Sequence, residues 1–228
     1  MTDYIIKMVN NHIIIDNEQK LVFDTGSPLS FHSLGHIIIG DETITVPTSL
    51  PEVSAEYLSQ NIGCDVQGLM GMDIINNHST TISLKDGFLL MNDDAPFGTE
   101  FCNLNMSRSL GGLLCIKVKV NKRTAKMIVD SGAKISYISP NFVNGMKEEN
   151  NVEDFSPYIG NFLTPLFTCD VDLLVGGISY SQQFGTPPAI ISTMLSLFGA
   201  DGLLGVELFK RYRLQIMNGR LFFPPQGI

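Results

Sequence analysis

The sequence predicts an all-β protein made of two similar halves, with few short helices. Three observations support this prediction: a composition rich in turn-forming residues, an internal repeat, and turn dipeptides set between apolar segments. The chain of 228 residues is 44% hydrophobic and 17% charged, and it contains 21 Gly, 11 Pro and no Trp. Such a composition is typical of a compact globular protein in which many short strands are joined by turns.

An internal repeat divides the chain. Residues 20–31 align without a gap with residues 126–137, and each segment runs from an apolar strand into an Asp-Thr-Gly or Asp-Ser-Gly turn. A second pair of similar segments, residues 68–75 and 202–209, follows in the same order. Two such blocks in matched order predict two homologous structural units.

The predicted units comprise residues 1–98 and residues 113–228. Residues 99–112, which end in Gly-Gly, form the predicted linker. Each unit begins with alternating apolar residues, at 4–15 and at 113–120, and this alternation predicts strands that lead into hairpins.

Tight turns are expected within both units. Asp-Gly and Asn-Gly between apolar runs are strong signals of a two-residue hairpin. The predicted hairpin turns lie at residues 17–18, 86–87, 121–122 and 218–219.

The second unit carries an insertion. From the aspartate of the first block to the glycine of the second block, the chain runs 47 residues in the first unit (24 to 71) and 75 in the second (130 to 205). Matching residues 37–42 with residues 173–178 places the extra residues between Ser139 and Asp172.

Bulk properties exclude several classes of function. The net charge of -8 argues against a nucleic-acid partner, because such proteins concentrate Lys and Arg on one face. The longest apolar stretch, residues 187–206, is interrupted by polar residues, so we expect a core strand and helix and no membrane association. Four scattered Cys and four scattered His predict no metal site and no cofactor. The N-terminus lacks the features of a secretory signal, which predicts a cytoplasmic protein.

The duplicated turns resemble those of pepsin-like and retropepsin-like aspartic peptidases. In that family each Asp-Thr/Ser-Gly turn is followed by a hydrophobic-hydrophobic-Gly segment, as at residues 69–71 and 203–205 here. One Asp-Thr-Gly would be weak evidence, since Asp and Gly also form ordinary turns. Two copies at matched positions cover both halves. The resemblance implies a bilobal fold of two retropepsin-like β-barrel lobes in one chain, and therefore a monomer.

The resemblance also implies an activity, with Asp24 and Asp130 as the catalytic residues. Two neighbouring carboxyl groups cannot both ionise easily, so they share a proton over a broad pH range. The ionised partner activates a water molecule, and the protonated partner donates a hydrogen bond to the developing oxyanion. The expected function is that of an aspartic endopeptidase acting on a peptide or protein substrate.

Neighbouring residues support the two turns in this family. By resemblance they are Thr25, Gly26, Ser27, Ser131, Gly132 and Ala133. The hydroxyls of Thr25 and Ser131 are expected to form hydrogen bonds across to the opposite loop. Ser27 and Ala133 differ, because the hydroxyl of Ser can donate to the adjacent carboxylate and favour its charged form, whereas the side chain of Ala cannot. We hypothesise that Asp24 carries the charge more often and that this asymmetry raises the pH optimum above that of secreted pepsins.

A mobile hairpin, the flap, covers the substrate in this family and excludes water. Pepsins supply the flap from the first lobe, but the first unit is too short here, so the insertion in the second unit is the predicted source. The predicted flap residues are Tyr158, Ile159, Gly160, Asn161 and Phe162, with Gly160 at or near the tip. An ordinary surface loop is the alternative interpretation.

A different class of function is a catalytically silent module that binds a peptide or protein, because a fold does not guarantee an activity. Both aspartates, both following hydroxyls and both glycines are present. A pure binding scaffold requires none of them, so their presence favours the peptidase.

Overall fold

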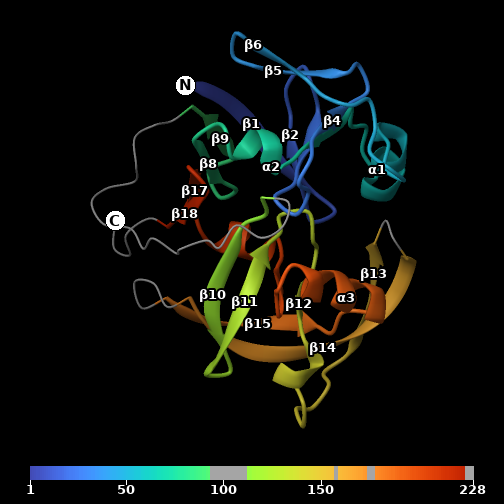
Figure 1. The fold of residues 1–228 in the computed structure, drawn as a ribbon, viewed down its shortest axis with the longest axis vertical. Helices are drawn as coiled ribbons and strands as arrows, with labels where there is room; N and C mark the ends of the chain where they lie inside the picture. Colours follow the sequence, from blue (N-terminus) through green and yellow to red (C-terminus); the bar gives the residue numbers. More distant parts are fainter. Residues whose placement is uncertain (93–111, 157–158, 174–177, 224–228) are drawn as a thin grey trace.

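The protein folds mainly into β-strands with a few short helices, as expected for the predicted all-β class (Figure 1). The computed structural model describes residues 1–92, 112–156, 159–173 and 178–223. Within these ranges the strands form a nine-stranded sheet, a seven-stranded sheet and a separate two-stranded sheet.

The described part of the first half, drawn in blue to green in the upper part of Figure 1, contains nine strands and two helices. They are β1 (Thr2–Val9), β2 (His12–Ile15), β3 (Leu21–Phe23), β4 (Phe31–His32), β5 (His36–Ile39), β6 (Glu42–Thr45), α1 (Ala55–Ile62), β7 (Gly68–Met70), α2 (Met72–Ile75), β8 (Thr80–Ser83) and β9 (Phe88–Met91).

The described part of the second half contains nine further strands, two α-helices and one 3-10 helix. They are β10 (Cys115–Val120), β11 (Arg123–Val129), β12 (Ser136–Ile138), η1 (Pro140–Phe142), β13 (Asn151–Ser156), β14 (Gly160–Asp172), β15 (Ser179–Gly185), α3 (Ala189–Leu197), β16 (Gly202–Leu204), α4 (Glu207–Arg211), β17 (Leu214–Met217) and β18 (Arg220–Phe222).

The two halves repeat one strand arrangement. In the first half β7 lies between β3 and β4, parallel to β3 and antiparallel to β4. In the second half β16 lies in the same way between β11 and β12. In the first half α1 precedes β7 and α2 follows it, and in the second half α3 precedes β16 and α4 follows it. The internal repeat of the sequence is therefore also a repeat of the structure.

The hairpin turns agree with the sequence in part. The turns at 121–122 and 218–219 are two residues long with positive φ at both positions, as predicted. The connections at 84–87 and 16–20 are longer than the two-residue turns predicted there. A two-residue turn at Asn10 and Asn11 also divides the apolar alternation of residues 4–15 into β1 and β2. Asparagine tolerates positive φ, which explains why the chain turns there.

The insertion forms a long hairpin. Its residues build η1, β13 and most of β14, where the sequence comparison places them. Strands β13 and β14 pair from Asn151 and Pro165 to Ser156 and Gly160. Beyond this hairpin β14 continues along β15 and so joins the seven-stranded sheet. Between β4 and α1 the first half carries the shorter β5–β6 hairpin, which forms the separate two-stranded sheet.

The last two strands cross to the sheet of the first half. Strand β17 pairs antiparallel with β8, and β18 pairs with β17 at the end of the nine-stranded sheet. The predicted unit 113–228 therefore contributes two strands to the sheet of the predicted unit 1–98. The predicted linker, residues 99–112, lies outside the described residues except for Gly112.

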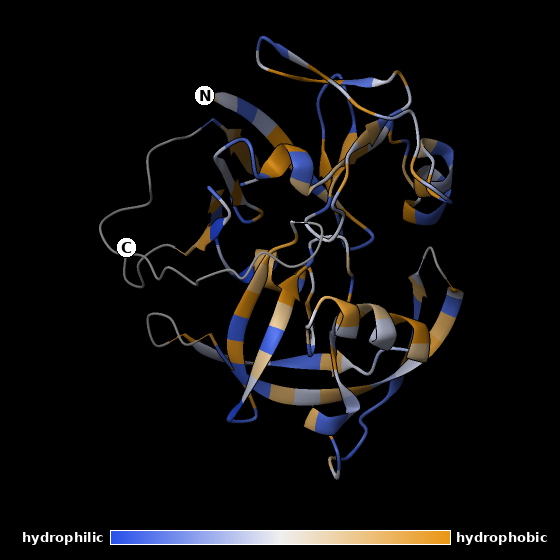
Figure 2. Cartoon of the chain, viewed as in Figure 1, coloured by the Kyte–Doolittle hydropathy of each residue, from blue (hydrophilic) through white to orange (hydrophobic). Residues whose placement is uncertain are grey.

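One hydrophobic core runs through both halves. Its buried members include Phe23 and Met70 from the first half and Val129 and Phe209 from the second. The rings of Phe23 and Phe209 pack edge to face with their centroids 6.5 Å apart. Figure 2 shows hydrophobic residues along the strands of both halves. Because the core is shared, the halves are expected to unfold together.

The apolar stretch at residues 187–206 contains a helix, α3, and a strand, β16. The strand is buried, as predicted, but α3 is not a core helix, because Leu195 is its one buried residue and Ile190 and Leu197 are exposed. Among the described residues, none of the helices has the length and apolar character needed to span a membrane.

We expect Phe209→Ala to lower the free energy of unfolding by about 3–5 kcal/mol, because it leaves a cavity where the two halves meet. Urea unfolding followed by circular dichroism measures this loss, and it should show one transition. The control is Leu197→Ala, at a side chain that is 69% exposed, with an expected effect within about 0.5 kcal/mol. Two separate transitions, only one of them shifted by Phe209→Ala, would contradict a shared core.

Candidate active site

Each aspartate of the internal repeat stands at the end of a central strand. The backbone N–H of Asp24, just after β3, donates to the carbonyl of Met70 at 3.0 Å. The N–H of Asp130, just after β11, donates to the carbonyl of Leu204 at 2.9 Å. Strands β7 and β16, each lying between two other strands of its half, therefore hold the two aspartates in equivalent places.

Four reciprocal hydrogen bonds join the two turns. The N–H of Thr25 donates to Ser131 Oγ, and the N–H of Ser131 donates to Thr25 Oγ1. The hydroxyl of Thr25 donates to the carbonyl of Val129, and the hydroxyl of Ser131 donates to that of Phe23. Each of these distances is 2.9 Å, and both hydroxyl residues are fully buried. The hydroxyls predicted to reach across thus link the opposite strands directly.

The two glycines allow the carboxyl groups to meet. A Cβ placed on Gly132 would lie 2.6 Å from Cγ of Asp24, and a Cβ on Gly26 would overlap the carboxyl of Asp130. Any side chain at either glycine would occupy the space that the opposite carboxyl fills. The two carboxyl groups form a hydrogen bond with each other. Asp24 and Asp130 nevertheless keep intermediate solvent exposure, so a reactant can approach them.

The surroundings of the pair favour a shared proton. Burial and the adjacent charge of Asp24 raise the pKa of Asp130 to about 8. Burial also raises the pKa of Asp24, but N–H donors oppose that increase, including Gly26, which donates to Asp24 Oδ1 at 2.8 Å. The hydrogen bond between the carboxyls adds to the increase at Asp130 and opposes the increase at Asp24, so Asp130 is the favoured site of a shared proton.

The predicted role of the Ser27 hydroxyl is wrong. Its Oγ donates to the carbonyl of Leu29 at 2.7 Å and not to the carboxylate of Asp24. The chain turns through Pro28 and brings this carbonyl within reach of the hydroxyl. Ser27 acts on Asp24 through its backbone N–H instead. Ala133 supplies the matching N–H to Asp130 Oδ1 at 3.1 Å, so the two positions are more alike than their side chains suggest.

Two serines behind the turns were not among the predicted site residues. The N–H of Gly71 donates to Ser30 Oγ at 2.8 Å, and the N–H of Gly205 donates to Ser136 Oγ at 2.9 Å. Ser30 and Ser136 occupy matching positions in the internal repeat. That match is the sequence signal by which they can be found.

Four of the five predicted flap residues lie at the end of the β13–β14 hairpin. Ile159 is in its turn, residues 160–162 begin β14, and Tyr158 lies outside the described residues. Gly160 has a φ of 73°, a left-handed conformation that favours glycine. The structure thus places the predicted flap residues on a long hairpin of the second half.

Side chains of the hairpin contact both halves. The hydroxyl of Tyr137, in β12, donates to Oδ2 of the buried Asp154 in β13 at 2.5 Å. The ring of Phe162 lies 6.2 Å from the ring of Tyr137. On the other side, the ring of Phe155 lies 5.8 Å from that of Tyr57 in α1. The hairpin is therefore anchored on the second half and reaches a helix of the first, consistent with the position of β13 below α1 in Figure 1.

No protein-family model matches the chain, and no curated protein sequence matches it significantly. Within the described ranges, no group of three or more His, Cys, Asp or Glu is placed to hold a metal ion. The carboxyl pair offers a base and an acid side by side.

The raised pKa of Asp130 makes a prediction about stability. Between about pH 4, the ordinary pKa of Asp, and pH 8, the folded state keeps a proton that the unfolded state has lost. The stability of the wild type should therefore fall as pH rises through this range. Asp130→Asn removes the titrating group, so its unfolding free energy should exceed that of the wild type by at least about 1 kcal/mol at pH 8.

Urea unfolding at a series of pH values measures this difference. Asp3→Asn, at an exposed position, is the control and should follow the wild type at every pH. A constant gap between Asp130→Asn and the wild type from pH 4 to pH 8 would show that the carboxyl does not hold its proton in the folded state.

Proposed function

We propose that this protein is an aspartic endopeptidase that hydrolyses peptide bonds with a water molecule activated between Asp24 and Asp130. The observation that carries the proposal is the hydrogen-bonded pair of carboxyl groups, which occupy matching turns of an internal repeat and whose interaction favours a proton on Asp130. Two carboxyls in one accessible site supply a base and an acid at the same pH. The proposed fold is the bilobal, pepsin-like one, with a β-barrel lobe from each half.

The proposed reaction uses the two carboxyls in complementary ways. Ionised Asp24 accepts a proton from the water as its oxygen attacks the carbonyl carbon, and protonated Asp130 donates to the carbonyl oxygen. Asp24 then passes its proton to the amide nitrogen as the C–N bond breaks. The hydroxyl of the collapsing intermediate returns a proton to Asp130. The pair ends with the single proton with which it began.

The β13–β14 hairpin is the proposed flap. Its anchorage through Tyr137 and Asp154 and its contact with Tyr57 support a cover that reaches from one half of the molecule to the other. A flap excludes water and contacts the substrate backbone, so it contributes to both substrate affinity and rate.

The proposal includes a monomer that acts on peptides or proteins in the cytoplasm. Two complete turns in one chain supply both carboxyls, which supports the monomer. The free thiols of Cys64, Cys115 and Cys169 support a reducing compartment.

Cleavage of a peptide library should depend on both aspartates. We expect Asp24→Asn and Asp130→Asn each to lower kcat by about 100-fold to 10,000-fold, because each removes one partner of the acid–base pair. The rate of the wild type should fall on the alkaline side near pH 8 as Asp130 loses its proton. Mass spectrometry of the cleaved library at several pH values measures both effects. If the wild type binds peptides but shows no cleavage that is lost in the two variants, the protein is instead a silent binding module.

Replacing residues 159–162 with four glycines should raise KM about tenfold or more, because the proposed flap loses the side chains that cover the substrate. The matched control replaces residues 40–43, which form the turn of the β5–β6 hairpin and the first two residues of β6, with four glycines. Steady-state kinetics on one library-derived peptide compares the two variants. Unchanged kinetics in the first variant would identify the β13–β14 end as an ordinary surface loop.

A further inference from the structure

The two serines behind the aspartate turns differ in what lies beyond them. Both accept a hydrogen bond from the glycine of the second repeat block. The first serine, Ser30, is also bound by a carboxylate: its hydroxyl donates to Asp73 Oδ1 at 2.5 Å, and its N–H donates to Asp73 Oδ2 at 3.0 Å. Asp73 therefore binds both the side chain and the backbone of Ser30, with one carboxylate oxygen for each.

The second half has a carboxylate at the same repeat position but uses it elsewhere. Glu207 matches Asp73 in the alignment of the second blocks. Its carboxylate forms ion pairs with Lys210 at 3.6 Å and with Arg211 at 3.2 Å, on the surface of α4. The connection from the carboxylate to the serine is thus described only in the first half.

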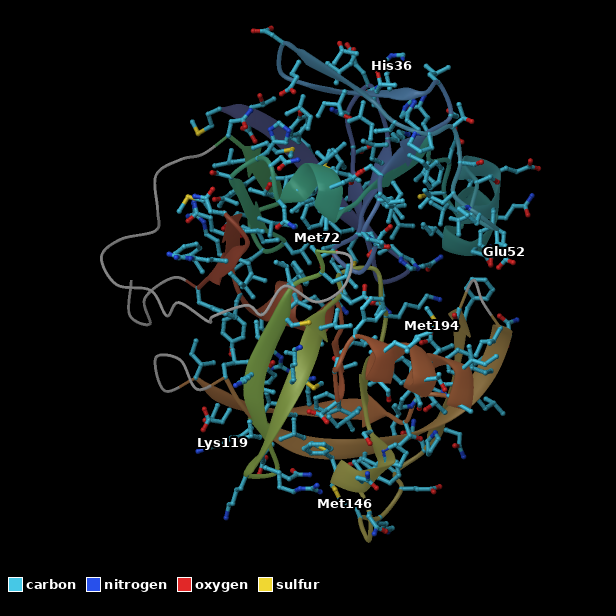
Figure 3. All side chains as sticks on the ribbon, in the orientation of Figure 1. His36, Glu52, Met72, Lys119, Met146 and Met194 are labelled. Carbon is cyan, nitrogen blue, oxygen red and sulfur yellow. The ribbon has the colours of Figure 1, made fainter. Side chains whose placement is uncertain are left out.

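The segment that Asp73 holds is the continuation of the Asp24 turn. Its beginning is fixed where the N–H of Met72 donates to the carbonyl of Ser27 at 2.9 Å. Its middle packs closely against Gly71, because a Cβ added to Gly71 would lie 2.6 Å from the carbonyl oxygen of Leu29. Its end is fixed at Ser30 by Asp73. Figure 3 labels Met72 near the junction of the two halves, which is where this contact lies.

We propose that Asp73 is a positioning residue for Asp24, acting through Ser30 on the turn that carries the first carboxylate. Residues 27–30 are held at both ends, so the backbone N–H groups at the start of this turn stay aimed at Asp24. A change of about 1 Å in such a geometry is enough to slow a reaction about 100-fold. The kinetic consequence rests on the proposed peptidase function, whereas the positioning itself does not.

The pH dependence of Asp24 reports whether the turn has moved. The groups that act on its carboxylate are the carboxyl of Asp130 and the backbone N–H groups of Gly26, Ser27 and Gly132. Weakening the N–H donors makes the anion less stable and moves the acidic limb of the rate profile to higher pH. Loss of the negative charge of Asp73 alone would move that limb to lower pH. The direction of the shift therefore separates positioning from simple electrostatics.

The test compares Asp73→Asn with Glu207→Gln, which changes the matching residue of the second half. For Asp73→Asn we expect kcat to fall about tenfold or more, KM to stay within about twofold, and the acidic limb to move to higher pH. Glu207→Gln should leave all three unchanged. Equal effects of the two variants, an unmoved acidic limb, or a shift to lower pH would each overturn the proposal.

A second pair of variants covers the case in which Asp73→Asn fails to fold. Ser30→Ala and Ser136→Ala both remove the acceptor of a glycine N–H, but only Ser30→Ala cuts a bond to a carboxylate. Only Ser30→Ala should move the acidic limb upward. Equal limbs in the two alanine variants would overturn the proposal.

A measurement without substrate keeps this inference separate from the proposed function. Aspartate labelled with 13C at the carboxyl carbon allows the titration of Asp24 to be followed by NMR, with assignment from Asp24→Asn. An upward shift of its titration in Asp73→Asn supports the positioning role even if the wild type cleaves no peptide. If cleavage occurs but the titration is the same in Asp73→Asn and the wild type, the peptidase stands and the positioning role is wrong.

Discussion

Two carboxyl groups repel each other when both are ionised and lose hydration when both are buried, yet this fold brings Asp24 and Asp130 into hydrogen-bond contact. The buried hydroxyls of Thr25 and Ser131 bind the facing strands reciprocally, and two glycines leave the space that the carboxyls occupy. The inserted strands β7 and β16 fix the position of each turn from behind. These hydroxyls, glycines and strands together hold the two carboxyl groups close to each other.

The two halves meet this constraint with the same backbone and with different supports. Both aspartates receive N–H donors from their own turns. The supports of the two matching serines differ, because Asp73 binds Ser30 whereas Glu207 forms ion pairs on the surface of α4. Among the described residues, the long β13–β14 hairpin also has no counterpart of similar length in the first half. A carboxyl pair that is to hold a single proton benefits from such inequality, since the proton then has a preferred site.

The sequence predicted best what depends on local pattern. The two aspartate turns, the matching glycine segments at residues 69–71 and 203–205 and the position of the insertion all follow from an internal repeat, which compares the chain with itself. The error at Ser27 arose because a hydroxyl has several acceptors within reach, and Leu29 competes with the carboxylate. The link from Ser30 to Asp73 and the pairing of β17 with β8 were missed because they join distant residues, and no local pattern encodes such pairs.

The crossing of β17 to β8 affects the order in which the protein can be completed. A ribosome makes β8 long before β17, so the sheet of the first half waits with an open edge until nearly the whole chain has emerged. An open edge invites pairing with other chains, so the protein is exposed to misassembly during this interval. The arrangement also ties the finished sheet to the presence of the second aspartate, because Asp130 precedes β17 in the chain. A truncated product that lacks the second carboxyl therefore also lacks a completed first half.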